Sequence, residues 1–440
     1  MTARLSQSAF EVARLGPQTF RPDARAGRRC MPDESERIAA FCNLRELQPY
    51  IDAGEPLPSF ELAGRRASLF FDPSKVTAGI VTCGGLCPGQ NAVIRSIVLT
   101  LEYAYGVPKV LGFRYGYNGL SAKPLAEPIV LQKQHVQNLH LEGGTMLSSS
   151  RGTSSTAEIV DSLQRHGVNM LFTIGGDGTL RGAQAIAAEI RERKLPIAVI
   201  GVPKTIDNDI MWIDQSFGFR TAVEEAHRAI QAAHTEAAGA WNGIGLVKLM
   251  GRHSGFIAAH ATLANPDVNF CLIPEVPFGL EGRGGFLQAL EERLSERHHA
   301  VIVVAEGAGQ ELLEGAGASQ TDASGNVKLK DIGVFLKDRM QSYLERRGLH
   351  TTIKYIDPSY IVRSLPANAS DSKLCLILGQ NAVHAAMAGR TNLVIGYWHQ
   401  HFTHVPISLA VGKRKQIDPL DDTWQAVLGS TGQPASMLAE

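Results

Sequence analysis

The chain has 440 residues, of which 44% are hydrophobic and 20% charged, a composition typical of a globular protein with two or three lobes. Forty-three basic residues balance 43 acidic ones, so net charge gives no reason to expect a nucleic-acid or anionic-membrane partner. No apolar run reaches the roughly 20 residues that a membrane-spanning helix needs. The six scattered cysteines indicate reduced thiols, so we expect a cytoplasmic protein without membrane or nucleic-acid partners.

Residues 1–70 have no strong periodicity and contain several prolines and charged clusters, which predicts an N-terminal extension. Six arginines among the first thirty residues are also compatible with a transit peptide. Glu11 and Asp23 interrupt that pattern and no apolar signal core follows, so targeting is the less favoured interpretation.

From Val76 onward, apolar runs alternate with amphipathic stretches. Five of these runs read as buried strands, at residues 76–83, 169–174, 197–202, 243–250 and 299–307. Uninterrupted apolar strands that alternate with helices predict an α/β fold with largely parallel sheets covered by helices on both faces. Ligands bind such sheets beyond the carboxyl ends of the strands. Here those ends carry the sequences GG, GGDGT, PKTIDND, MGR and EG.

Two later segments read as peripheral. Residues 310–327 are rich in Gly, Ser, Asp and Glu, which predicts a surface excursion. The stretch that follows Gly412 is polar and interrupted by proline, so we expect residues 411–440 to form a C-terminal tail.

The pair Gly84-Gly85 closes the first predicted strand and precedes a helical pattern over residues 92–105. A backbone without Cβ atoms can approach a phosphate closely, and a helix N-terminus supplies N–H groups with partial positive charge. A tight turn needed only for packing explains the pair equally well.

The sequence GGDGT at residues 175–179 lies between a predicted strand and a predicted helix. Gly176 and Gly178 let the backbone cradle phosphates, and Asp177 can hold Mg²⁺, which prefers carboxylate and phosphate oxygens. Thr179 can donate to a phosphate or cap the helix, and the two roles are compatible. The motif predicts a nucleotide site with a metal ion, although lipid kinases and NAD kinases carry a similar turn.

The sequence PKTIDND at residues 203–209 follows the third strand and is hard to explain by packing. Phosphoryl transfer to an alcohol needs a base near the attacking hydroxyl and a metal that spreads the charge. Asp207 is the candidate base, Asp209 could orient it or help the metal, and Thr205 could bind the transferring or the acceptor phosphate. A turn that caps the next helix explains Asn208 and Asp209 but not the whole segment.

From roughly Asp72 to Tyr397 the sequence resembles the phosphofructokinase family. The resemblance rests on ordered motifs: TCGGLCPGQNAVIR, GGTMLSSSRG, GGDGT, PKTIDNDI, SFGFRTAVEEA, MGRHSGFIA, AEG and YIVR. It implies two similar lobes, each with a largely parallel sheet covered by helices, in addition to the N-terminal extension. It also implies transfer of a phosphoryl group to the 1-hydroxyl of fructose 6-phosphate, which gives fructose 1,6-bisphosphate in glycolysis.

On this resemblance we expect residues 71–215, together with 365–410, to form a nucleotide-binding lobe. Residues 216–364 are expected to form a sugar-phosphate-binding lobe. The extension and the tail lie outside these two lobes.

The resemblance distributes the site residues between donor and acceptor. Around the donor it places Gly85, Arg151, Gly152, Gly176, Asp177, Gly178 and Thr179, with Mg²⁺ near Asp177. Around the sugar phosphate it places Thr205, Ile206, Asp207, Met250, Gly251, Arg252, Glu306, Tyr360 and Arg363. The predicted catalytic set is Asp207 as base with Thr205, Arg252 and Asp209.

The residue types suit these assignments. Arg252 and Arg363 are forked donors matched to phosphate oxygens, and Glu306 is an acceptor suited to sugar hydroxyls. A structural ion pair is the alternative role for either arginine.

Gly178 and Lys204 bear on the choice of donor. Typical bacterial ATP-dependent members have glycine at the position of Lys204. Lysine there is typical of pyrophosphate-dependent members and of an ATP-using branch with plant and trypanosomatid enzymes. Pyrophosphate users carry aspartate at the position of Gly178, where it would fill the space beside the α-phosphate of a nucleotide and repel it. Gly178 therefore favours ATP. Lys204 is either a remnant that is tolerated without a role in the reaction or a positive charge that stabilises the transition state.

Relatives complete their active site across a subunit interface, so the resemblance implies a homo-oligomer, in particular a tetramer. The arginine that bridges subunits in the common bacterial form is Gly243 here, with Lys248 and Lys354 as nearby basic candidates. A second arginine, expected on the helix after GGLCPGQN, is replaced by Leu99, so the allosteric site of relatives does not carry over.

Two alternatives to an ATP-dependent enzyme stay open. The first is a pyrophosphate-dependent enzyme of the same fold or, more remotely, a kinase of another substrate that uses GGDGT. PKTIDND, MGR and YIVR disfavour another substrate. The second is a catalytically silent regulatory subunit, which the presence of Asp177, Asp207, Arg252 and Glu306 disfavours.

Overall fold

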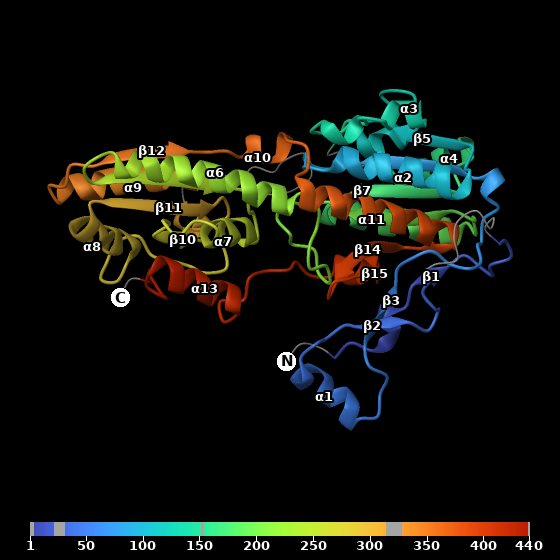
Figure 1. Cartoon of the computed structure of the whole chain (residues 1–440), viewed down its shortest axis with the longest axis horizontal. Coiled ribbons are helices and arrows are strands. Elements are labelled where there is room, and N and C mark those ends of the chain that lie inside the picture. The colour runs from blue at the N-terminus through green and yellow to red at the C-terminus, as the bar shows by residue number, and fades with distance from the viewer. Residues whose placement is uncertain (1–3, 22–30, 151–153, 314–327, 439–440) are drawn as a thin grey trace. The chain divides into compact units, whose positions relative to one another are not determined.

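The computed structural model describes residues 4–21, 31–150, 154–313 and 328–438. The chain forms two compact units, coloured by residue number in Figure 1. The first contains residues 1–205, 210–218 and 365–413, and the second contains residues 206–209, 219–364 and 414–440. Within the described ranges, no helix is both long enough and apolar enough to cross a membrane.

The first unit is built on a nine-stranded sheet in the order β2-β3-β15-β14-β8-β7-β4-β5-β6. The five strands from β14 to β5 are parallel, and the outer strands run antiparallel to their neighbours. The strands are β2 (Arg37–Ala39), β3 (Ser59–Leu62), β4 (Thr77–Thr82), β5 (Lys109–Phe113), β6 (Ile129–Val130), β7 (Met170–Gly175), β8 (Ala198–Pro203), β14 (Leu393–Trp398) and β15 (His401–Pro406). A separate pair joins β1 (Ala13–Arg14) to β13 (Arg390–Thr391).

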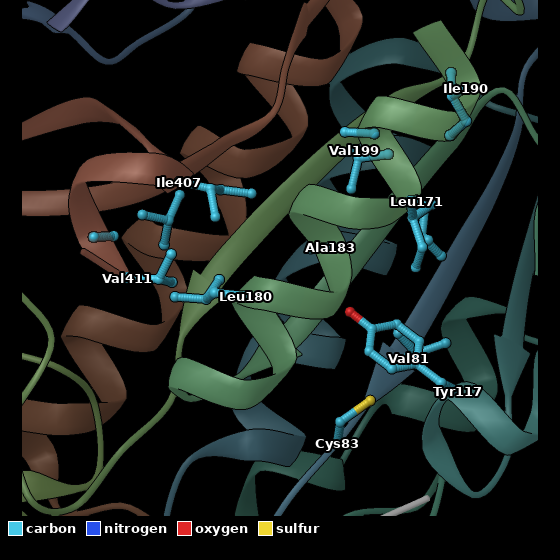
Figure 2. Packing of buried hydrophobic residues seen from close by; sticks show 14 of the residues in the cluster. Val81, Cys83, Tyr117, Leu171, Leu180, Ala183, Ile190, Val199, Ile407 and Val411 are labelled. Carbon is cyan, nitrogen blue, oxygen red and sulfur yellow. The ribbon is translucent and has the colours of Figure 1, made fainter. Parts of the chain in front are cut away.

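Helices cover both faces of this sheet because alternate side chains of each central strand point to opposite sides. On one face, Val81, Leu171 and Val199 form a core with α4 (Thr156–Arg165) and α5 (Asp177–Glu192), part of which Figure 2 shows. On the other face, α2 (Gln90–Tyr105) packs along α11 (Ala369–Met387), which contacts β8. The remaining short helices of the unit are η1 (Gln7–Phe10), α1 (Leu44–Asp52), η2 (Pro73–Lys75), η3 (Gly116–Leu120), α3 (Lys133–Val136), η4 (Leu139–Leu141) and α12 (Ile407–Ala410).

The segment that precedes residue 70 is built into the first unit. Its strand β3 pairs antiparallel with β15, and β2 pairs antiparallel with β3, so both strands extend the large sheet. Phe10 is fully buried, and its ring lies 5.0 Å from that of Phe60 and 5.5 Å from that of Trp212. Phe10 therefore belongs to the same hydrophobic core as the large sheet.

The second unit contains a four-stranded parallel sheet in the order β10-β11-β9-β12. Its strands are β9 (Gly243–Leu249), β10 (Phe270–Leu272), β11 (His299–Ala305) and β12 (Thr352–Ile356). Its helices are α6 (Phe219–Ala238), α7 (Phe256–Leu263), α8 (Phe286–Arg297), η5 (Gln310–Leu313), α9 (Ile332–Arg346), α10 (Ile361–Ser364) and α13 (Asp422–Thr431). The predicted excursion at residues 310–327 begins with η5, and its part from 314 onward lies outside the described residues.

Both faces of the smaller sheet are covered. Side chains such as Leu246 and Ile302 form a core with α8 and α9. On the opposite face α6 lies close to β9, because a Cβ at Gly243 or Gly245 would stand within 2.6 Å of an α6 carbonyl oxygen. The C-terminal helix α13 packs on α7, and its Trp424 is only 2% exposed.

All five strands predicted from apolar runs are present, and both units have largely parallel sheets with helices on both faces. The predicted fold class is therefore confirmed. The predicted polar turns follow strands of both sheets.

Candidate active site

The turn at residues 175–179 joins β7 to α5 in the first unit. Gly175 is required there because a Cβ would lie 2.1 Å from the Thr179 hydroxyl oxygen. Gly178 differs, since among the described residues no atom beyond its chain neighbours and the backbone of its own helix lies within 4 Å of the position that its Cβ would take. Packing among these residues therefore does not explain glycine at 178, and the open space suits a ligand.

Asp177 is the first residue of α5 and Gly176 is its N-cap, which makes no side-chain cap hydrogen bond. The Asp177 carboxylate pairs with the Nε of Arg181 one turn later, at 3.1 Å. Thr179 lies in the first turn, mostly buried, and its carbonyl oxygen accepts a hydrogen bond from Tyr117. The amides at such a helix start carry partial positive charge, which favours phosphate.

Lys204 links three strand ends of the first unit. Its backbone N–H donates to the carbonyl oxygen of Gly175 at 3.0 Å. Its side chain is buried, and the Nζ donates to the carbonyl oxygen of Gly85 at 2.6 Å. Lys204 therefore holds the turns that follow β4 and β7 next to the end of β8. Of the other predicted donor residues, Arg151 and Gly152 lie outside the described residues.

The predicted base Asp207 follows β8 in a short segment, residues 206–209, that belongs to the second unit. The carbonyl oxygen of Asp207 accepts a hydrogen bond from the Ser254 hydroxyl at 3.3 Å. Asn208 has a φ of 54°, a left-handed conformation that asparagine tolerates better than most residues. The neighbouring Thr205 lies in the first unit, where its carbonyl oxygen accepts from Ser216 at 2.6 Å.

The electrostatic environment of Asp207 favours its protonated form. Loss of solvation raises the pKa of Asp207 to about 8, and the negative charges of Asp209 and Glu306 act in the same direction. The positive charge of Arg414 and a hydrogen bond from the backbone of Arg252 oppose this shift. A carboxyl whose pKa lies near the working pH is suited to accept and return a proton.

The motifs MGR (250–252) and AEG (305–307) lie side by side at the ends of β9 and β11. The N–H of Glu306 donates to the carbonyl oxygen of Leu249 at 2.8 Å, and that of Gly307 donates to Gly251 at 3.0 Å. A Cβ at Gly307 would lie 2.0 Å from the carbonyl oxygen of Arg252, so only glycine fits this position. These contacts continue the register of the two parallel strands into the predicted sugar-phosphate loops.

Three predicted sugar-phosphate residues share one electrostatic environment. Burial raises the pKa of Glu306, whereas the nearby positive charges of Arg252, Lys248 and Arg363 lower it. The Arg363 guanidinium lies 4.8 Å from the centre of the exposed Tyr360 ring. The second unit thus brings Arg252, Glu306 and Arg363 near one another from three separate segments.

The two lysines near the predicted interface position are both paired within the second unit. Lys248 is largely buried and lies 2.8 Å from Asp331 and 2.9 Å from Asp357. Lys354 makes an exposed ion pair with Glu236 at 3.7 Å. Lys248 therefore ties β9 to the start of α9 and to the loop that leads to Tyr360.

Arg414 is not among the site residues predicted from the sequence, yet its guanidinium lies 2.8 Å from the carboxylate of Asp209. It belongs to residues 411–440, for which the sequence predicts a C-terminal tail. Its only signal was the cluster of basic residues in the sequence GKRK, next to no recognisable motif. Within the described ranges there is no group of three or more His, Cys, Asp or Glu that could hold a metal ion.

Comparison with known proteins identifies the family. The family model "Phosphofructokinase" matches residues 77–386. The chain belongs to the phosphofructokinase family. The family model thus covers GGDGT, PKTIDND, MGR, AEG and YIVR but ends before Arg414, and the family predicted from the motifs is confirmed.

Similar phosphofructokinases come from bacteria, plants and a trypanosome. The chain is 53% identical over 383 residues to an ATP-dependent 6-phosphofructokinase of Borreliella burgdorferi, with 86% of each chain covered. It is 52% identical to chloroplastic ATP-dependent 6-phosphofructokinase 5 of Arabidopsis thaliana, covering 84% of this chain and 68% of the relative. The ATP-dependent 6-phosphofructokinase of Trypanosoma brucei brucei is 48% identical, with 83% of this chain and 75% of that one covered.

Solved phosphofructokinase structures share the fold at lower identity. A pyrophosphate-dependent phosphofructokinase from Marinobacter aquaeolei matches with a TM-score of 0.64 and 21% identity, over 81% of this chain and 91% of that chain. The Pichia pastoris phosphofructokinase in the T-state matches with a TM-score of 0.63 and 22% identity, over 81% of this chain and 37% of that one. At such identities the likeness concerns the fold alone.

Proposed function

We propose that this chain transfers the γ-phosphoryl group of ATP to the 1-hydroxyl of fructose 6-phosphate, which makes it a transferase and kinase of glycolysis. The observation that carries this proposal is the position of Asp207, a buried carboxyl that accepts a hydrogen bond from the backbone of Arg252 and whose pKa is raised by burial and then by Asp209 and Glu306. The relatives at about 50% identity that are named ATP-dependent 6-phosphofructokinase support the same activity.

On the acceptor side, Asp207 takes the proton of the 1-hydroxyl as that oxygen attacks the γ-phosphorus, while the bond from this phosphorus to the β–γ bridging oxygen breaks and ADP leaves. Asp209 orients the Asp207 segment, and Arg252 stabilises charge on the transferring group. Arg363 and Tyr360 bind the 6-phosphate end of the sugar, and Glu306 accepts hydrogen bonds from sugar hydroxyls. The remaining residues assigned to the sugar phosphate are Thr205, Ile206, Met250 and Gly251.

On the donor side, Gly85 and residues 176–179 line the phosphates of ATP. Arg151 and Gly152, which lie outside the described residues, are assigned to the donor by the family resemblance alone. The open space beside Gly178 leaves room for the part of a nucleotide that an aspartate would repel. Asp177 fits Mg²⁺, because this ion is commonly held by one or two carboxylates together with substrate phosphates. When bound, it would neutralise charge on the β- and γ-phosphates.

Turnover with each of the two phosphoryl donors tests the assignment of ATP directly. Purified protein would be assayed with fructose 6-phosphate and Mg²⁺, and with either ATP or pyrophosphate as donor. We expect faster turnover with ATP. Faster turnover with pyrophosphate would replace the donor assignment by the pyrophosphate-dependent alternative, and no turnover with either would favour a silent regulatory subunit.

The role of Asp207 is tested in the same assay. Asp207→Asn keeps the shape of the side chain but removes the base, so kcat should fall by roughly 10²-fold or more while KM for ATP stays the same. Asp214→Asn, at an aspartate outside the proposed machinery, serves as a control. Near-normal kcat in Asp207→Asn would remove this residue as the base.

We also propose a cytoplasmic location and a homo-oligomer, specifically a tetramer. The location is supported by the free thiols among the described cysteines, Cys42, Cys83, Cys87, Cys271 and Cys375. Assembly is supported by the family resemblance, since relatives complete their site across an interface. Light scattering coupled to gel filtration tests the assembly, and a monomeric mass would exclude it.

A further inference from the structure

Residues 414–417 lie outside the part of the chain that the family model matches, and they join two loops of the proposed acceptor site. Arg414 Nη1 donates to the Asp209 carboxylate at 2.8 Å, and the N–H of Lys415 donates to the Asp209 carbonyl oxygen at 2.8 Å. Gln416 Nε2 donates to the carbonyl oxygen of His253 at 2.9 Å. We call residues 414–417 the C-terminal strap.

Asp209 is held by the strap at both its side chain and its backbone. Its carboxylate is only 7% exposed, and a buried carboxylate requires a close positive partner. The strap supplies that partner in Arg414, which is itself partly exposed. Asp209 stands two residues after the proposed base, so a change in its position would move Asp207 as well.

The far end of the strap is anchored beside the MGR loop. The N–H of Ile417 donates to Glu275 Oε1 at 2.9 Å, and the same oxygen accepts from the N–H of Gly255 at 3.0 Å. The Ile417 side chain is buried, which fixes this end of the segment by packing. Lys415 Nζ lies 5.2 Å from the centre of the Phe256 ring. The strap therefore contacts residues 209, 253 and 256 directly and Gly255 through Glu275.

The strap also places the positive charge of Arg414 near the carboxyl groups of the proposed acceptor site. The negative charges of Asp209 and Glu306 both act on Asp207, and the positive charge of Arg414 opposes them. When Asp207 is ionised, a neighbouring cation reduces the repulsion between its carboxylate and those two groups. Arg414 approaches from a separate segment and can balance these charges without occupying the position of Arg252, which we assign to the transferring phosphoryl group.

We propose that the C-terminal strap positions the base Asp207 relative to Arg252, with Arg414 as the positioning residue that fixes Asp209. This inference rests on the proposed function, because it depends on Asp207 as the base. Arg414 does not itself touch the reacting atoms in this account. Its loss should slow the chemical step and leave nucleotide binding unchanged.

The test uses the full chain and the substitutions Arg414→Gln and Arg414→Lys. Arg414→Gln removes the charge and should lower kcat by roughly 30- to 100-fold, the size of effect expected when a catalytic group is misplaced by about 1 Å. KM for ATP should change less than about twofold, since the donor residues lie elsewhere in the fold. Arg414→Lys keeps a positive charge and should recover most of the lost kcat, although lysine cannot reproduce the forked contact.

Arg346 offers a matched control, because it makes an exposed ion pair with Glu281 at 3.3 Å in the same unit. Arg346→Gln should leave kcat and both KM values unchanged. A kcat of Arg414→Gln within threefold of the parent would overturn the proposal. So would equal losses in Arg414→Gln and Arg414→Lys accompanied by equal drops in melting temperature, since that pattern indicates a purely structural contact.

Gln416→Ala provides a second route if Arg414→Gln does not fold. It removes one hydrogen bond to the carbonyl oxygen of His253 and leaves every charge in place. We expect a fall in kcat of about threefold or more at an unchanged melting temperature; an unchanged kcat would then overturn the proposal. Activity of the parent enzyme with fructose 6-phosphate is measured first, so failure of the proposed function is distinguished from failure of the strap.

Discussion

The ammonium group of Lys248 lies 2.9 Å from the carboxylate of Asp357, which joins β9 to the loop before Tyr360 and Arg363. The same ammonium pairs with Asp331, the N-cap of α9. Lys248 is two residues before Met250, so one side chain connects the MGR segment to the segment that we assign to the 6-phosphate. Both carboxylates hold the pKa of Lys248 above its ordinary value.

This contact predicts that Lys248→Met weakens sugar binding. The loop that contains Tyr360 and Arg363 loses its anchor, so KM for fructose 6-phosphate should rise by about tenfold while KM for ATP stays the same. Arg346→Met is the matched control, because Arg346 makes an exposed pair with Glu281 in the same unit. Equal KM values for fructose 6-phosphate in the two variants would contradict this role of Lys248.

The raised pKa of Asp207 predicts how activity depends on pH. The base works as a carboxylate, so kcat/KM for fructose 6-phosphate should rise with pH until about 8, the pKa of Asp207 in the free enzyme. Initial rates between pH 6 and pH 9 measure this limb. A profile that is level across this range would show that no group with such a pKa is required in its ionised form.

The same pKa shift predicts that the stability of the folded protein falls with rising pH, whereas the activity rises. The pKa of Asp207 is higher in the folded protein than the ordinary value of 3.8, so the folded state binds this proton more tightly. The stability it contributes is complete below pH 3.8 and is lost as pH rises through about 8. Asp207→Asn cannot ionise, so its melting temperature should exceed that of the parent at pH 8.5. A lower melting temperature of the variant at that pH would contradict the shift.

Gly178→Asp tests the donor assignment from the protein side. The open space at this position means that the new side chain should not disturb packing among the described residues. Its charge should repel the nucleotide, so kcat/KM for ATP should fall by roughly 10²-fold while the melting temperature stays close to that of the parent. Gly178→Ala is the control for bulk without charge. If both variants lose ATP activity equally, size rather than charge excludes the nucleotide.

The buried ion pair of Arg390 and Glu61 predicts a large effect on stability. Arg390 is fully buried, and its guanidinium lies 2.8 Å from Glu61 Oε1 and 2.8 Å from Glu34. Arg390→Met leaves the buried Glu61 with one partner fewer and should lower the free energy of unfolding by about 3 kcal/mol. Arg346→Met removes an exposed pair with Glu281 and should cost less than about 1 kcal/mol. Urea unfolding of both variants measures the difference.

Some elements could not be found from local pattern. Strands β14 and β15 are joined by His399 and Gln400, with φ values of 48° and 66°. A two-residue turn with positive φ at both positions usually shows Asn or Gly, and neither occurs at residues 399 and 400. Likewise, β2 and β3 are short strands at one end of the sheet, and β15, the strand that joins β3 to the rest of the sheet, lies more than 300 residues later. Short edge strands have weak periodicity, so the sequence analysis assigned none of them.

The sequence by itself determined the long central strands and the chemistry of the turns that follow them. Strands buried on both faces need continuous apolar runs, and their ends need glycine or polar residues wherever the backbone turns tightly, as at Gly175. These are local requirements, so they are visible in local sequence. The motifs GGDGT, PKTIDND and MGR were therefore recognisable from local sequence as those of the phosphofructokinase family.

Only the tertiary structure decided which charged groups meet. Asp209 and Arg414 are 205 positions apart in the chain, and nothing near either residue indicates the other. The pKa of Asp207 depends on Asp209, Glu306 and Arg414, which come from three segments of the second unit. Electrostatic energy depends on distance in space and on burial, and the fold alone determines both for residues so far apart in sequence.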